Sequence, residues 1–345
     1  MAGQPPLKAG GRWLLERLDP AWAEFGLLAV SHVWLMIFLA FTLEGAGRRN
    51  PQLLARGQGA ALVLGALVAA GVAGYAAALA EMFGPSRRVG RPSPRRSRLA
   101  RGPVAAAGAL LGLLIAIAAS LWLGQVSTLL VLLTAAGMLF YQLAGRFFPA
   151  VTVLGWGLAQ VLLMLIPNPE LSLTWPVLLA MTHAVGCALV GHVLGARRPK
   201  LTASDGWIIC LGWMFLSLLL AGLMRRSEPA GWWAAAAQAH TLGLGPLVAV
   251  VGLGPAAVWA LHRSHIAGEP RWARAARFAR LGVLWLILYD ASWLISASLW
   301  RQAAVLTGLL ILAAAARPIL TAARQALEAP PSYRVTLAPD VDEPR

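Results

Sequence analysis

The sequence predicts an all-α protein, a polytopic bundle of transmembrane helices. Of its 345 residues, 59% are hydrophobic and only 12% are charged, which is about half the charged fraction of a soluble domain. The apolar residues lie in continuous runs of roughly 20, the length that an α-helix needs to cross the hydrocarbon layer of a membrane. A transmembrane β-barrel would instead show short segments of alternating polarity.

About ten runs are candidate spans, bounded by Arg, Pro or Gly clusters. They cover residues 22–43, 58–80, 103–123, 126–145, 150–167, 175–196, 206–223, 231–261, 281–299 and 302–320. The third and fourth runs are separated only by Gly124 and Gln125, and the ninth and tenth only by Trp300 and Arg301. These short links predict tight antiparallel hairpins. The eighth run is interrupted by prolines and glycines, including Pro255, and is expected to be kinked.

The distribution of positive charge predicts which side of the membrane each connection faces. With the N-terminus inside, most of the 29 Lys and Arg residues fall in inner segments, as the positive-inside rule requires. The net charge of +15 is therefore interpreted as topology and contact with anionic lipid on the cytoplasmic side, and we expect no binding of nucleic acid.

Three regions follow from this topology. Residues 1–21 are predicted to be a cytoplasmic N-terminal segment, residues 22–322 a transmembrane helical domain, and residues 323–345 a disordered, Pro-rich cytoplasmic tail. We therefore predict a multi-pass integral membrane protein, located in a membrane such as the bacterial inner membrane, with both termini in the cytoplasm.

Ionisable residues inside the runs are few. Asp290 lies near the centre of the ninth run, with Tyr289 and Trp293 beside it. A charge in the membrane core costs a few kcal/mol or more, so it needs a partner or a purpose. Two interpretations stay open: a contact to substrate, proton or metal in a central cavity, and a buried partner for an Arg or a Ser on a neighbouring helix. Glu81, just before a cluster of arginines, is interpreted first as an interfacial ion-pair residue.

Four histidines, His32, His183, His192 and His240, lie within or at the ends of predicted spans. Histidines from facing helices hold haem iron in helical bundles, which makes haem a candidate cofactor. No two of these histidines have the i, i+3 or i, i+4 spacing of a shared metal site. The alternative is that each is a hydrogen-bonded packing residue. The two cysteines of the chain are interpreted as small apolar residues.

Three segments carry a more specific pattern. RPSPRRSRLARG (91–102) precedes an apolar run, residues 141–149 contain a Tyr-x4-Arg-x2-Pro element, and ARFARLGVLWLILYDASW covers 276–293. In order, spacing and sidedness these segments resemble the UbiA-type membrane prenyltransferase superfamily over about residues 12–300. The resemblance implies a nine-helix core with one extra C-terminal span, and a site capped by the cytoplasmic loops after the second, sixth and eighth helices.

The chain departs from that family at its metal site. Family members carry Asp-rich motifs at the inner ends of the second and sixth helices, where carboxylates hold Mg²⁺ against the substrate diphosphate. Here the corresponding stretches contain only Glu81 as an acid, with His192 as the nearest polar residue in the second stretch. Because a cation must bridge carboxylate and phosphate, Mg²⁺ is not expected in the usual mode, and no metal ligand or catalytic residue is carried over.

The residues expected around a substrate are charged or polar and lie in the basic inner loops or in the helices beside them. They are Glu81, Arg95, Arg98, Arg101, His192, Arg197, Arg198, Lys200 and Asp290.

Four functions compete at this point. The first is an inactive relative that binds an isoprenoid, quinone or pigment-like lipid, as an accessory subunit with a membrane-protein partner. The second is an active prenyltransferase in which the Arg and Lys residues hold the diphosphate directly, since guanidinium groups suit phosphate. The third is a haem-binding protein, because residues 237–270 loosely resemble a late segment of the NnrS family. A transporter, suggested by the broken eighth run and Asp290, is the fourth.

Overall fold

The computed structural model describes residues 20–42, 51–83, 96–145, 147–168, 175–195, 199–227 and 244–328. Within these ranges the secondary structure is helical throughout, with no β-strand. The helices are α2 (Pro20–Thr42), α3 (Pro51–Arg56), α4 (Gln58–Phe83), α5 (Arg96–Leu123), α6 (Gln125–Ala144), α7 (Pro149–Leu165), α8 (Trp175–Leu194), α9 (Ala203–Ser227), α11 (Leu244–Ile266), α12 (Arg271–Ser296) and α13 (Trp300–Glu328).

Eight of the described helices are long and apolar enough to cross a membrane, and α7 is a shorter apolar helix of 17 residues. The prediction of a multi-pass helical membrane protein is therefore confirmed. The first part of the predicted eighth span, residues 231–243, lies outside the described residues, and α11 covers the rest. The total of ten spans stays a prediction.

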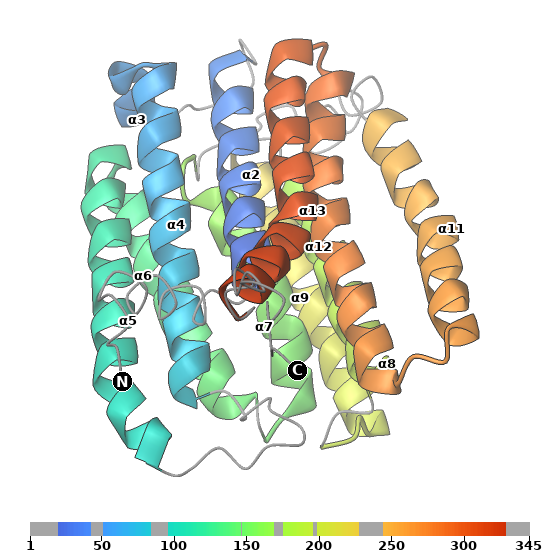
Figure 1. The fold of residues 1–345 in the computed structure, drawn as a ribbon. Coiled ribbons are helices and arrows are strands. Elements are labelled where there is room, and N and C mark those ends of the chain that lie inside the picture. Colours follow the sequence, from blue (N-terminus) through green and yellow to red (C-terminus); the bar gives the residue numbers. More distant parts are fainter. Residues whose placement is uncertain are drawn as a thin grey trace, which may run out of the picture.

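The bundle is built around α2 (Figure 1). This helix packs against α4, α7, α12 and α13, and 67% of its apolar window is buried inside the protein, compared with 11% for α9. The strongly apolar α9 and α13 therefore expose most of their surface, as expected for helices that face lipid. The centre of the molecule is the contact between α2 and α12.

Glycine allows α4 and α5 to pack backbone against backbone. A Cβ atom placed on Gly71 would lie 2.6 Å from the carbonyl oxygen of Gly112, and one on Gly112 would lie 2.8 Å from the carbonyl oxygen of Gly71. Neither backbone atom can move aside without moving its helix. Small residues at helix crossings give this close approach in membrane bundles, where dispersion replaces the hydrophobic effect as the driving force.

The two tight hairpins predicted from the sequence are present. Only Gly124 separates α5 from α6, and its φ of 136° explains why a glycine stands there. The link between α12 and α13 is residues 297–299, a few residues earlier than predicted, and Ser298 takes a left-handed φ of 61° in it. The difference arises because the apolar character continues through the turn, so hydropathy alone places the break too late.

Candidate functional site

A fully buried polar centre joins α2 to α12. Asp290 on α12 and the adjacent Ser31 and His32 on α2 are each 0% exposed. The Ser31 hydroxyl donates to Asp290 Oδ2 at 2.7 Å, and His32 Nδ1 lies 2.7 Å from the same oxygen. With Asp290 ionised, the Nδ1–H of His32 is the second donor. These two bonds offset part of the cost of burying a carboxylate, and they lock two helices that are far apart in sequence.

The arrangement follows from helix geometry. Ser31 is the middle residue of α2, so the centre lies midway along the most buried helix. Successive residues of a helix point about 100° apart, and the Asp290 side chain sits where it reaches both neighbours. Asp290 thus has the serine partner that its structural interpretation expects, together with a histidine.

Several polar atoms of this centre have no hydrogen-bond partner. They include Asp290 Oδ1 and His32 Nε2. On the same stretch of α12, the Tyr289 hydroxyl and the Trp293 indole N–H also have no hydrogen-bond partner, and the two rings pack edge to face with their centroids 6.0 Å apart. Trp293 follows Tyr289 by four residues and Asp290 by three, so its side chain lies one turn along α12 from both. Buried polar atoms are nearly always satisfied in native proteins, and a local group of exceptions calls for an explanation.

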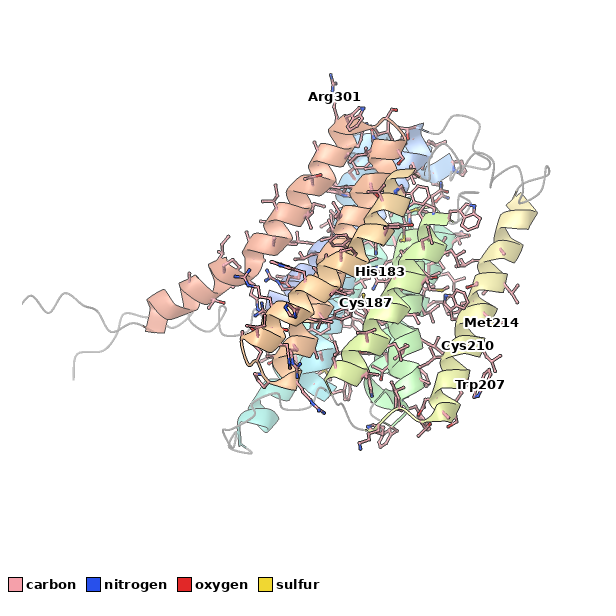
Figure 2. All side chains as sticks on the ribbon, turned by 90° about the vertical axis from the view of Figure 1, so that its right-hand side faces the viewer. His183, Cys187, Trp207, Cys210, Met214 and Arg301 are labelled. Atoms are coloured by element: carbon pink, nitrogen blue, oxygen red, sulfur yellow. The ribbon has the colours of Figure 1, made fainter. Side chains whose placement is uncertain are left out.

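A second polar contact lies between α8 and α12. The Nε2–H of His183 donates to the carbonyl oxygen of Gly282 at 3.2 Å, and the Cys187 sulfur lies 3.4 Å from the same nitrogen. A Cβ on Gly282 would be 2.8 Å from that sulfur, so any larger residue at 282 would displace the Cys187 side chain. Figure 2 shows His183 and Cys187 one turn apart on α8.

An ion pair ties together three helices. Arg280 Nε on α12 donates to Glu24 Oε1 on α2 at 2.7 Å, and Arg280 Nη2 donates to the carbonyl oxygen of Ala314 on α13, also at 2.7 Å. Glu24 is 5% exposed. Pro318, four residues after Ala314, has no N–H to donate, so Arg280 supplies the hydrogen bond that the proline removes.

Replacing Arg280 with glutamine is expected to lower the free energy of unfolding by about 3 kcal/mol, because Glu24 would remain buried without a cation. Arg277→Gln is the matched control on the same helix. Arg277 pairs with Glu269 but is 48% exposed, so its loss should cost less than about 1 kcal/mol. The two variants are compared by reversible unfolding in mixed micelles. Equal losses would show that the Glu24 pair is solvated.

The other residues predicted to surround a substrate are not joined to this centre by any contact among the described residues. Glu81 is exposed near the end of α4, and Lys200 is exposed before α9. His192 is 6% exposed, and its Nε2–H donates to the Pro199 carbonyl oxygen at 3.1 Å, which fastens the end of α8 to the following loop.

The side chains of the arginines predicted to bind substrate lie outside the described part of the chain. Arg98 and Arg101 belong to α5, but only their backbone is described, and Arg95, Arg197 and Arg198 lie outside the described residues, as does His240. Their predicted role in binding diphosphate stays a prediction.

The described part of the chain also bears on metal binding. No group of three or more His, Cys, Asp or Glu side chains comes together there to hold a metal ion. Asp205, the acid nearest the second basic loop, has a local role. It accepts hydrogen bonds from the Thr202 amide and hydroxyl while its own amide donates to Thr202, which forms a capping box at the start of α9.

Sequence reasoning singled out Asp290 and His32 but did not pair them, and it did not identify Ser31, Glu24 or Arg280. The Thr-x-x-Asp pattern at Thr202 was a usable signal for the α9 cap. For Ser31 the only signal was its position next to a histidine inside an apolar run.

Comparisons with known proteins add no assignment. No family model matches the chain, and no match is found among curated proteins or among solved structures.

Proposed function

We propose that this chain is a ten-span membrane protein with a UbiA-like nine-helix core and α13 as an extra C-terminal span, and that it binds a membrane-soluble isoprenoid, quinone or pigment-like lipid. The polar head of that lipid contacts the centre formed by Ser31, His32 and Asp290. Both termini are cytoplasmic in this proposal, and the chain acts as a lipid-holding subunit beside a membrane-protein partner.

The observation that carries the proposal is the set of unpartnered atoms at the centre. With the Nδ1–H of a neutral His32 bonded to an ionised Asp290, the unpartnered His32 Nε2 and Asp290 Oδ1 are both acceptors, and the Trp293 indole N–H, one turn along α12 from Asp290, is a donor. A head with both carbonyl and hydroxyl groups, such as a quinone in its two redox forms, complements such a mixed set. The apolar surroundings suit an isoprenoid chain.

The sign of the charge at the centre also selects among ligands. An ionised Asp290 in a low-dielectric interior repels a second anion strongly. A diphosphate head is therefore disfavoured beside Asp290, whereas an uncharged head is accepted. The active-prenyltransferase alternative would place its diphosphate elsewhere, at the cytoplasmic arginines, and does not use this centre.

Mass spectrometry of lipids extracted from the protein purified in mild detergent tests the proposal. We expect a prenyl or quinone species to co-purify with the wild type and to fall about tenfold in His32→Leu, the effect of losing one hydrogen bond to a buried group. His192→Gln is the control, because His192 bonds a loop carbonyl. If His32→Leu does not fold, Tyr289→Phe replaces it as the test variant, because it removes only a hydroxyl. No such species in the wild type, or equal amounts in folded variants, would overturn the proposal.

Haem is a second candidate, favoured by one feature of His32. Its Nδ1 is bonded to a carboxylate while Nε2 is unpartnered, which is the usual state of a metal-ligating histidine. The residues therefore fit one axial ligand, and a bound haem would supply electron transfer or gas binding. The absorption spectrum of the reduced protein tests this: a Soret band that disappears in His32→Leu supports haem, and its absence from the wild type overturns it.

A further inference from the structure

We propose that the C-terminal part of α13, residues 317–328, lies along the cytoplasmic surface of the membrane and binds anionic phospholipid headgroups. The proposal concerns a different part of the molecule from the lipid-binding centre and does not depend on it.

Helix length is the first argument. At 1.5 Å per residue, the 29 residues of α13 extend about 43 Å, whereas the hydrocarbon layer is about 30 Å thick. The α-helix needs only about 20 residues to cross, so roughly nine are in excess. A helix that starts at the outer surface with Trp300 would reach the inner surface near Leu320.

The residue pattern changes close to this point. The preceding segment, residues 308–316, is GLLILAAAA and is apolar on every side. From Arg317 the sequence becomes amphipathic, with polar residues at 317, 321, 324, 325 and 328, which are i, i+4, i+7, i+8 and i+11, and apolar residues at the other positions. Two of the five are arginines and one, at 328, is a glutamate. A uniformly apolar helix suits the membrane interior, and a helix with one basic polar stripe suits the interface.

A fixed contact marks where α13 leaves the bundle. Arg280 holds the Ala314 carbonyl that Pro318 leaves without an amide donor, and Glu24 holds Arg280 in turn. Beyond this contact the last turns of α13 run away from the other helices (Figure 2). The exit is therefore set by a proline and by an arginine that satisfies the carbonyl the proline frees.

Among the described residues, the side chains just after the exit are largely uncovered. The Ile319 side chain is 58% exposed, and Arg317 and Thr321 are exposed. The apolar face needs a hydrocarbon environment, while Arg317 needs water or an anion. The boundary of an anionic leaflet provides both on opposite sides of one helix, and each basic residue near such a surface adds to the binding.

Spin labels at two neighbouring positions test the orientation. Single cysteines are placed at Leu320 and Thr321 in full-length protein whose Cys187 and Cys210 are replaced by serine, in nanodiscs of phosphatidylcholine with or without phosphatidylglycerol. In the nanodiscs that contain phosphatidylglycerol, we expect the label at Leu320 to collide with oxygen from the acyl region and that at Thr321 to collide with a water-soluble nickel chelate. Equal access to the chelate, or burial of both labels in the acyl region, would overturn the proposal. Protection of both from both reagents would indicate a protein partner and would overturn it too.

Charge removal tests the lipid preference. In Arg317→Gln/Arg324→Gln, raising the phosphatidylglycerol content should no longer shift the Leu320 label from water into the acyl region. Loss of two arginines corresponds to a change of about 30-fold in the ratio of labels in the acyl region to labels in water. Arg301→Gln removes a charge from the opposite end of the same helix (Figure 2) and should leave the shift unchanged. A double variant that keeps the full dependence on phosphatidylglycerol would contradict the proposed headgroup contact.

Discussion

Replacing Asp290 with alanine is expected to lower the free energy of unfolding by about 3–5 kcal/mol, one of the two largest effects predicted for this chain. The substitution removes the acceptor for both Ser31 and His32, and breaking a buried, hydrogen-bonded polar pair from one side leaves its partners desolvated and unsatisfied. It also opens the contact between α2 and α12 at the centre of the bundle. Unfolding in mixed micelles, monitored by far-UV circular dichroism, measures the loss.

Two further variants separate the charge of Asp290 from its shape. Asp290→Asn keeps an oxygen that can accept both hydrogen bonds, so it should cost only about 1–2 kcal/mol. Asp205→Ala removes a capping acid from the first turn of α9 and should cost about 1 kcal/mol. If Asp290→Ala is no more destabilising than Asp205→Ala, the centre does not hold α2 against α12.

Adding one methyl group at Gly71 is expected to destabilise the protein by about 2 kcal/mol, although alanine is the better helix former. The new Cβ would lie 2.6 Å from the Gly112 carbonyl oxygen and 2.8 Å from the Ala116 amide nitrogen, so α4 and α5 must move apart. Gly74→Ala is the matched control on the same helix. Its Cβ would meet no atom within 4 Å, so the gain in helix propensity, up to about 1 kcal/mol, should remain.

The opposite signs of these two alanine variants make the comparison sensitive. Both are measured by thermal unfolding of the detergent-solubilised protein, where Gly71→Ala should lower the midpoint and Gly74→Ala should keep or raise it. A stabilised Gly71→Ala variant would show that α4 and α5 do not touch through their backbones.

Hydropathy and charge were enough to predict most helices. Each span must form the hydrogen bonds of its own backbone N–H and C=O groups and must present apolar side chains to lipid. The hairpin at Gly124 was predicted on the same basis. The turn after α12 was placed a few residues too late because Leu299 and Trp300 are as apolar as the helices they connect, so the break has no polar signal.

The candidate site was predictable only as isolated residues. Asp290 was recognised because a carboxylate is costly in an apolar run, but its partner Ser31 is 259 residues away, and only the packing of α2 against α12 brings them together. Glu24 and Arg280 are separated by 256 residues and were missed for the same reason. In addition, Arg280 comes just before the ninth predicted span, in a basic inner segment. The positive-inside rule already explains an arginine there, so the sequence offers no reason to expect a buried ion pair.

A cryo-electron-microscopy map of the protein in lipid nanodiscs, at a resolution that shows side chains, tests the central claim most directly. The account predicts elongated non-protein density with its polar end within hydrogen-bonding distance of His32 Nε2 or Asp290 Oδ1. A map in which these two atoms contact only protein side chains, with no density beside them, would contradict it.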